Sequence, residues 1–163
     1  MKKEITEEVA RNKAEVYCAT AERCISEVEG KLYQWGASKE SVEKIICHLL
    51  DEDFINEKRY ATAFVRDKYR FNAWGRMKIT LSMRQKGISD NLIDEALKEI
   101  DENVYQQTLK TLLDQKGRSI KAGSDFEIKG KIIRFALSRG FLMSEILPFV
   151  HLEDNEKALE NME

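Results

Sequence analysis

Hydrophobic residues recur along this chain at intervals of three and four positions, the spacing that places side chains on one face of an α-helix. Charged and polar residues fill the positions between them, and glycine, serine, asparagine or aspartate interrupts the pattern at short intervals. We therefore expect nine helices. The predicted ranges are 7–21, 26–35, 39–51, 57–72, 76–86, 90–100, 102–117, 126–139 and 144–157.

One short pattern occurs three times. Gly36, Gly87 and Gly140 lie 51 and 53 residues apart, and each ends a helical run and precedes an apolar residue. Glycine adopts positive φ without Cβ strain, so it commonly ends a helix. The repetition predicts three tandem three-helix repeats, at 1–53, 54–100 and 101–163, the last with an acidic C-terminal tail. Such units stack, so we expect an elongated, curved solenoid.

Capping residues support these helix starts. Ser38 and Ser89 follow the first two glycine turns, and Ser124 precedes the predicted eighth helix. A serine hydroxyl accepts a hydrogen bond from the free N–H groups of the first helical turn. The third copy of the pattern has Leu142 in place of the serine and carries Pro148 shortly afterwards. Its last helix is therefore expected to start differently or to fray.

The composition favours an all-α fold. One proline and eight glycines in 163 residues cannot supply the turns that a sheet protein needs, whereas good helix formers dominate. The longest apolar stretch, Ile45–Leu50, is far shorter than the ~20 residues of a membrane helix. The acidic N-terminus does not look like a signal peptide, and three cysteines without C-x-x-C spacing favour a reducing compartment. We expect a cytoplasmic protein without membrane contact.

The sequence offers no constellation for catalysis. The two histidines, His48 and His151, lie about a hundred residues apart and show no metal-ligand spacing. Cys47 lies in an apolar run and is expected to be a core thiol rather than a nucleophile. Neither a P-loop nor a G-x-G-x-x-G motif is present. We expect no enzyme activity, metal, cofactor or small-molecule substrate.

Charge is distributed unevenly along the chain, although the net charge is only −2. Residues 58–86 contain nine Lys and Arg against Asp67 alone, a net of +8, and residues 109–140 have a net of +5. The remaining blocks each have a net of −5. This alternation indicates an acidic or polyanionic partner that contacts part of the surface.

The basic block contains one ordered row. On a helix that starts near Glu57, Arg59, Arg66 and Arg70 fall within an arc of about 40°. Three aromatic residues fall in a similar arc more than a right angle away: Tyr60, Phe64 and Phe71. Periodicity leaves two interpretations open, a surface that binds anions and a merely solvated face opposite a core stripe. Nearby Trp74 is expected to pack rather than to stack on a ligand.

A series of short motifs occupies residues 48–97. It comprises D-F-I-N-E-K-R-Y-A at 53–61, F-V-R at 64–66, G-R-M-K-I at 75–79 and K-G-I-S at 86–89. This combination resembles the bacterial RecX family, and fainter matches extend to both sides. The resemblance implies three tandem three-helix repeats and a regulator of recombination, DNA repair and the SOS response. Proteins of this kind bind the RecA recombinase filament on single-stranded DNA and inhibit its ATPase and strand exchange.

The resemblance also directs attention to particular residues. Those expected to contact the filament are Arg59, Arg66, Arg70, Arg76, Lys78, Arg84 and Lys86. Those expected to be structural are Gly36, Gly75, Gly87, Gly140, Ser38 and Ser89. Position 76, often proline in the family, is arginine here. Weak contact with single- or double-stranded DNA is a further expectation, and the alternative is a direct nucleic-acid binder with helix-turn-helix-like repeats.

Overall fold

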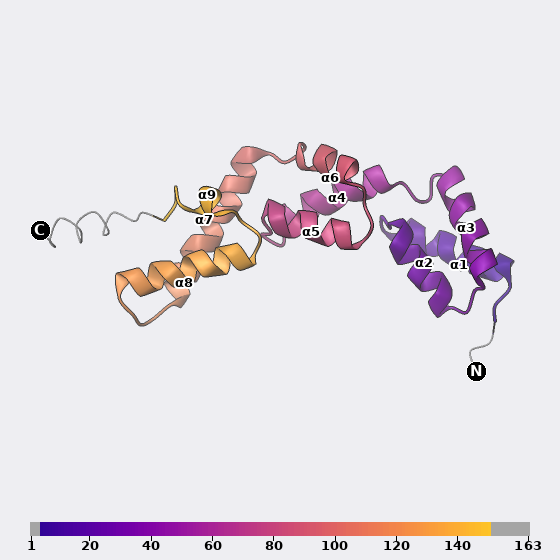
Figure 1. Ribbon diagram of the computed structural model, residues 1–163, viewed down its shortest axis with the longest axis horizontal. Coiled ribbons are helices and arrows are strands. Elements are labelled where there is room, and N and C mark those ends of the chain that lie inside the picture. Colours follow the sequence, from indigo (N-terminus) through magenta and orange to yellow (C-terminus); the bar gives the residue numbers. More distant parts are fainter. Residues whose placement is uncertain (1–3, 151–163) are drawn as a thin grey trace, which may run out of the picture. The chain divides into compact units, whose positions relative to one another are not determined.

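The structure is a computed structural model that describes residues 4–150 (Figure 1). Those residues form helices and no strands, which confirms the all-α prediction. The helices are α1 (Glu7–Thr20), α2 (Ile25–Gln34), α3 (Lys39–Asp51), α4 (Glu57–Arg70), α5 (Arg76–Gln85), α6 (Asp90–Leu97), α7 (Glu102–Ser119), α8 (Asp125–Ser138) and α9 (Met143–Ile146). Each one overlaps a helix that the hydrophobic pattern predicts.

The described chain divides into two compact units. The first unit comprises residues 4–64 and 82–99, and the second comprises residues 65–81 and 100–150. Helices α4 and α5 each begin in one unit and end in the other. The predicted repeat boundaries at 53/54 and 100/101, and the solenoid shape, stay predictions.

The helix termini have the geometry that the sequence pattern predicts. Gly36, Gly87 and Gly140 adopt φ values of 94°, 82° and 93°. The Ser38 hydroxyl accepts a hydrogen bond from the backbone N–H of Ser41 (3.2 Å), and Ser89 and Ser124 cap α6 and α8 in the same way. Each cap satisfies one of the free N–H groups of a first helical turn.

The predicted final helix, 144–157, is wrong in its length. Helix α9 spans only Met143–Ile146, and residues 151–157 lie outside the described residues. After Ile146 the backbone closes tighter turns, in which Phe149 donates to the carbonyl of Ile146 (3.0 Å). Pro148 has no N–H and cannot continue the helical ladder, which explains the early end.

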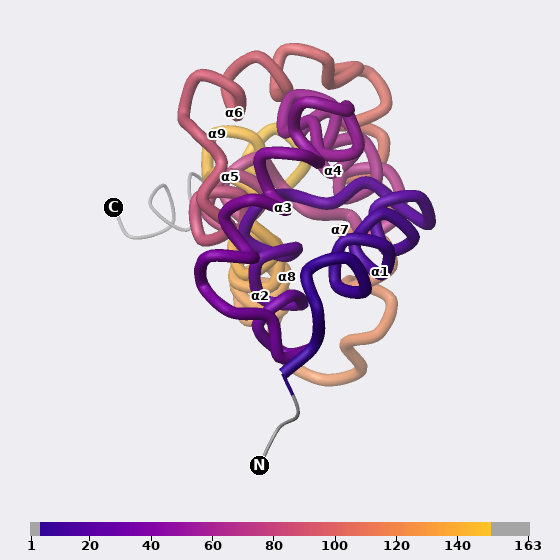
Figure 2. Tube along the Cα trace, turned by 90° about the vertical axis from the view of Figure 1, so that its right-hand side faces the viewer, coloured from indigo at the N-terminus to yellow at the C-terminus, as the bar shows by residue number. Residues whose placement is uncertain are grey.

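The core of the first unit is built mainly by α1, α2 and α3, which pack against one another (Figures 1 and 2). Its buried residues are Ala10, Ala14, Cys18, Val28, Leu32, Ala37, Val42, Ile45, Ile46, Leu49 and Ile55. Cys47 is exposed, so the expectation of a core thiol is wrong. On α3 the inward positions are 42, 45, 46 and 49, and a side chain at position 47 falls on the opposite side of the helix.

A half-buried carboxylate, Glu27, joins three segments of the first unit. Its Oε1 accepts hydrogen bonds from the Tyr60 hydroxyl (2.6 Å), the Cys24 thiol (3.3 Å) and Lys86 Nζ (3.3 Å). Burial by itself would raise the pKa of Glu27. The hydrogen bonds from Tyr60 and Cys24 and the charge of Lys86 outweigh that effect and lower the pKa. Burial and the same hydrogen bond raise the pKa of Tyr60.

The core of the second unit is organised around aromatic rings. Helices α7 and α8 pack together, and the chain reverses between them (Figure 1). Tyr105 on α7 lies between Tyr69 (ring centroids 6.3 Å apart) and Phe141 (5.3 Å). All three side chains are buried. They link the end of α4, α7 and the turn after α8 into one apolar cluster.

Two backbone segments of the second unit cross at glycines. The Gly75 N–H donates to the carbonyl of Arg139 (2.8 Å), and the Met77 N–H donates to that of Gly140 (3.0 Å). A Cβ atom on Gly75 would lie well within 3.0 Å of the Gly140 backbone. Only glycine at position 75 permits this approach, which holds the start of α5 against the end of α8.

Gly75→Ala should therefore destabilise the protein strongly. The added methyl meets backbone rather than a movable side chain, and we expect a loss of about 2–4 kcal/mol in the free energy of unfolding. Urea denaturation followed by circular dichroism measures this loss. Gly30→Ala in α2 is the matched control. Nothing lies within 4 Å of its Cβ position, so it should stabilise by about 0.5–1 kcal/mol. Equal effects of the two substitutions would contradict the crossing.

Glu27→Gln should remove a pH-dependent part of the stability. Because the folded-state pKa lies below the unfolded value of about 4.3, the charge stabilises the fold above that pH. The contribution is lost as pH falls through the folded-state pKa. We expect the variant to be less stable by about 1–2 kcal/mol at pH 7, a difference that shrinks on acidification.

Urea midpoints between pH 7 and pH 3 measure this dependence on Glu27. Glu40→Gln is the control, because Glu40 forms only an exposed pair with Lys44 and should change stability little at any pH. A difference for Glu27→Gln that stays constant with pH would rule out the proposed role of the charge.

Candidate partner-binding surface

The seven basic residues that the sequence singles out differ in what they contact. Arg59 is held within the first unit by Glu22 (Nε to Oε1, 2.5 Å) and Asp53 (Nη1 to Oδ2, 3.1 Å). It also donates to the carbonyl of Asp53 (3.0 Å). These bonds tie the start of α4 to the preceding segment and leave the guanidinium little capacity for another molecule.

Arg76 is equally committed within the second unit. Its guanidinium pairs with Glu102 and with Glu145 (Nη1 to Oε2, 2.7 Å) and lies 4.1 Å from the centre of the Tyr105 ring. The Tyr105 hydroxyl accepts from the Arg76 N–H (3.1 Å) and donates to Glu145 (3.2 Å). Burial would lower the pKa of Arg76, but hydrogen bonds and charges from Glu102, Tyr105 and Glu145 raise it.

This arrangement explains why position 76 holds arginine, where the resemblance leads us to expect proline. Arg76 is the first residue of α5, a position where proline is well tolerated because its N–H would have no helical partner. In this chain the backbone N–H is used, since it donates to the Tyr105 hydroxyl. The side chain then adds the two ion pairs. Arg76 therefore has a clear structural role.

Two further cations in the first unit have carboxylate partners. Lys86 pairs with Glu27 (3.3 Å) and is about one third exposed. Arg84 pairs with Asp90 (2.9 Å), and the side chains of both residues are largely exposed. An exposed pair of this kind contributes about 0–1 kcal/mol, so Arg84 can exchange partners at little cost, whereas Lys86 is part of a half-buried network with Glu27.

The remaining three predicted residues lie in the second unit, around the turn between α4 and α5. Arg66 is 58% exposed and reaches only the neighbouring Asp67, at 4.0 Å. Arg70 is exposed and donates to the Tyr69 hydroxyl (3.0 Å). Lys78 Nζ lies 4.6 Å from the centre of the Trp74 ring. None of these three is fixed by a close ion pair that the described residues show.

Two aromatic residues lie in the same turn. Trp74 is half-buried, and Lys68 Nζ also lies over its ring at 4.7 Å, so this tryptophan packs under cationic side chains. Phe71 is 81% exposed. Its predicted place in a buried stripe with Tyr60 and Phe64 is wrong, because the buried face of α4 is formed by Tyr60, Ala61, Val65 and Tyr69, and position 71 falls outside that face.

We call this region the turn surface and define it by five residues of the second unit: Arg66, Arg70, Phe71, Trp74 and Lys78. Three cations and an exposed phenyl ring suit an anionic surface that also offers apolar contact. Arginine forms paired hydrogen bonds to carboxylate or phosphate, and exposed aromatic residues commonly anchor interfaces. Whether any of the seven residues touches a partner stays a prediction.

A groove beside the turn surface was not predicted. Its volume is about 270 Å³, and its lining consists of Arg70, Ala73, Gln107, Thr108, Thr111, Leu112 and Gln115. The α7 residues at 107, 111 and 115 are spaced by four, so a polar stripe was visible in the sequence. The likewise unpredicted exposure of Phe71 had a signal too, the turn sequence N-A-W-G that follows it.

No cluster of three or more His, Cys, Asp or Glu suitable for a metal ion occurs in the described part of the chain. Over the same residues no helix has the length and apolar character to cross a membrane.

Two family models match the chain. One, described as RecX, second three-helix domain, matches residues 56–97. The other, described as RecX, third three-helix domain, matches residues 103–150. The first range contains α4–α6, and the second contains α8, α9 and all of α7 except its first residue.

Curated relatives carry the same description, regulatory protein RecX. The protein of Clostridium botulinum (strain Eklund 17B) is 34% identical over 117 residues, which cover 71% of this chain and 54% of that protein. The protein of Chlorobaculum tepidum is 30% identical over 133 residues, 82% of this chain and 81% of that protein. The chain spans about half the length of the clostridial relatives that it matches.

Solved structures agree in fold. A crystal structure of regulatory protein RecX superposes with a TM-score of 0.79 at 25% identity, over 85% of this chain and 70% of the other. The crystal structure of RecX from Lactobacillus salivarius gives 0.73 at 28% identity, over 86% and 91%. Family models, relatives and fold all agree, and the chain belongs to the RecX family of regulatory proteins.

Proposed function

We propose that this chain binds the RecA recombinase filament on single-stranded DNA and inhibits its ATPase and strand-exchange activities. Membership of a family of regulatory proteins supports the regulatory role in this proposal. The observation that carries it further is the turn surface, which lies within the range matched by the second three-helix domain. Through such binding the chain would modulate recombination and DNA repair.

The chemistry of the turn surface suits a filament. A nucleoprotein filament presents protein carboxylates and DNA phosphates at close spacing, and both are acceptors for arginine and lysine donors. The exposed Phe71, directly after the end of α4, supplies an apolar anchor in the same turn. Charged side chains set specificity and association rate, and a buried aromatic anchor slows dissociation.

Inhibition by binding needs no catalytic group in this chain. ATP hydrolysis and strand exchange require filament subunits to move relative to one another and to accept a second DNA. A helical protein that occupies the filament groove opposes both steps by favouring the filament conformation to which it binds. The chain acts in this proposal as a ligand of the filament and not as an enzyme.

Charge reversal at the turn surface should weaken inhibition. The protein is titrated into RecA, single-stranded DNA and ATP at moderate salt, and ATP hydrolysis is followed. For Arg66→Glu combined with Arg70→Glu, we expect half-inhibition to require at least about tenfold more protein, a loss of about 1.4 kcal/mol or more in binding. Both side chains are exposed, so the unfolding midpoint should change little.

The matched control is Lys44→Glu combined with Lys98→Glu, which makes the same change in net charge at two exposed lysines of the first unit. It should inhibit as well as the unmodified chain. Unchanged ATPase at a stoichiometric excess of the unmodified chain would overturn the proposed function. Equal losses in the two double variants would overturn the role of the turn surface.

The same variants separate filament binding from direct binding to nucleic acid. If DNA alone were the target, the unmodified chain would bind an oligonucleotide tightly without RecA. The affinity would then fall steeply with salt, by about 0.9 log units per phosphate contact. Fluorescence anisotropy of a labelled oligonucleotide measures this. We expect only weak binding, since three acidic blocks of the chain, each of net −5, repel phosphate.

A further inference from the structure

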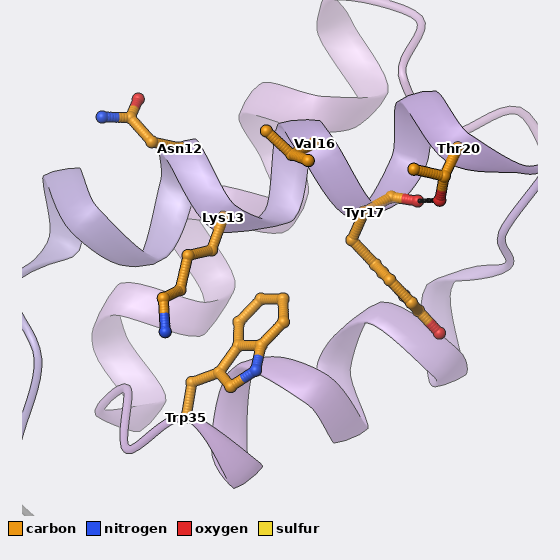
Figure 3. Close-up of a pocket in the computed structure, with 6 residues that line it drawn as sticks. All are labelled: Asn12, Lys13, Val16, Tyr17, Thr20 and Trp35. Atoms are coloured by element: carbon orange, nitrogen blue, oxygen red, sulfur yellow. Dashed lines mark hydrogen bonds between the residues drawn. The ribbon is translucent and has the colours of Figure 1, made fainter.

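A second surface feature lies in the first unit, between α1 and the end of α2. It is a groove of about 550 Å³ lined by Asn12, Lys13, Val16, Tyr17, Thr20 and Trp35. Figure 3 shows these six side chains. The volume falls within the range of about 300–1,000 Å³ that holds a ligand or an anchoring side chain. The groove lies outside the turn surface and belongs to the other compact unit.

The floor of the groove is aromatic and rigid. The rings of Tyr17 and Trp35 meet edge to face, with centroids 6.1 Å apart and an interplanar angle of 86°. Both residues pack partly against the core of the first unit, which fixes their orientation. An edge-to-face pair of this kind offers a preformed apolar surface that loses little entropy on binding.

Helix α1 also carries exposed apolar side chains that lie outside the core of its unit. The core-facing residues of α1 are small: Ala10, Ala14 and Cys18. Two valines lie elsewhere on the helix, Val9 at 46% and Val16 at 65% exposure. Val16 borders the groove, so the aromatic floor continues onto an exposed aliphatic edge. The two together form an exposed apolar strip.

The rim of this strip is cationic. Lys13 Nζ lies 5.5 Å from the centre of the Trp35 ring, and Lys31 Nζ lies 5.7 Å from that of Tyr17. Arg23 stacks on Tyr17 at 3.9 Å and donates to the Tyr17 carbonyl (3.3 Å) and the Thr20 hydroxyl (3.2 Å). These contacts hold the positive charges beside the aromatic floor before any partner arrives.

The positive rim contrasts with its surroundings, because residues 1–57 carry a net charge of −5. Several carboxylates of α1, α2 and the segment between them are engaged elsewhere. Glu15 contacts His48 (2.8 Å), Glu22 contacts Arg59 (2.5 Å), and Glu27 accepts from Tyr60. The described residues that line the groove include none of them. Cations therefore flank the groove, while these three carboxylates contact residues elsewhere in the unit.

We propose that this groove binds an acidic, amphipathic segment of a partner protein. One large apolar side chain of the segment would enter between Val16, Tyr17 and Trp35, and carboxylates on either side of it would meet Lys13, Arg23 and Lys31. Amphipathic helices dock in this way, with apolar anchors at i, i+3 or i+4, and i+7. A nucleic acid fits less well, because its continuous phosphate charge would face the acidic remainder of residues 1–57.

This site is independent of the proposed function, since it uses residues of a different unit. It would let one chain contact two partners, or two parts of one partner. Linking two modest contacts raises overall affinity well above that of either alone.

Trp35 provides a direct probe. The chain has two tryptophans, so Trp74→Phe leaves Trp35 as the only indole emitter. This variant is titrated with a synthetic helical peptide that carries leucines at i, i+4 and i+7 and glutamates between them. We expect a saturable shift of Trp35 emission to shorter wavelength, because the leucine excludes water from the ring. A peptide with the leucines replaced by serine, and one with the glutamates replaced by lysine, should produce no saturable shift.

Two changes in the protein test the assignment to the groove. Lys13→Glu combined with Lys31→Glu should weaken peptide binding by at least about tenfold, since favourable charge contacts become repulsive. Val16→Ser should weaken it through loss of apolar contact, and its 65% exposure makes it tolerable to the fold. Lys39→Glu combined with Lys44→Glu on α3 is the charge-matched control and should bind as the parent does.

Any of four binding results would overturn the proposal. They are no saturable binding of the acidic peptide, undiminished binding by the Lys13/Lys31 variant, equal binding of the lysine-substituted peptide, and preferential binding of a single-stranded oligonucleotide by the same emission change. A Trp35 shift that depends on protein concentration without peptide, together with a dimer in sedimentation, would assign the groove to a second copy of the chain and also contradict the proposal.

Discussion

The structure depends on two half-buried carboxylates, one in each compact unit. Glu27 accepts from Tyr60 and pairs with Lys86, and Glu145 accepts from Tyr105 and pairs with Arg76. In the first case Tyr60 of α4 and Lys86, which directly follows α5, meet a carboxylate of α2. In the second, Tyr105 of α7 and Arg76 of α5 meet a carboxylate of α9. Short apolar helices alone would specify neither register nor packing partner. A satisfied polar network does so, because any other arrangement leaves a desolvated charge without a partner.

The same pairing sorts the basic residues by role. Arg59, Arg76 and Lys86 form ion pairs within the fold. Arg66 and Arg70 are exposed, and Lys78 is half-buried with its ammonium over the Trp74 ring. A net charge of +8 over residues 58–86 is therefore not available to a partner in full. This division explains how a chain of net charge −2 can present a local cationic surface. It favours recognition of a partner of defined shape over uniform attraction to polyanions.

Local signals made the fold predictable. Helical periodicity, glycine turns and serine caps act within a few residues, so each helix of residues 4–150 overlaps a predicted one. Three predictions were wrong: the burial of Cys47, the burial of Phe71 and the length of α9. Cys47 belongs to an apolar run but points away from the core, Phe71 lies just beyond the end of its helix, and Pro148 cuts α9 short. The ion pairs of Arg76 with Glu102 and Glu145 join segments up to 69 residues apart, and no pattern in the sequence foretells them. For that reason the sequence could not show which of the seven basic residues are held in ion pairs within the fold, and the structure was needed to separate them.

We propose that pairing within the fold separates the structural cations from those that bind a partner, and lysine reactivity distinguishes the two groups. The chain is treated briefly with an acetylating reagent, free and bound to a RecA filament on single-stranded DNA, and modification is read by mass spectrometry. The filament should lower the reactivity of Lys78 severalfold and leave that of Lys86 and Lys98 unchanged. Protection of Lys86 with no protection of Lys78 would contradict it.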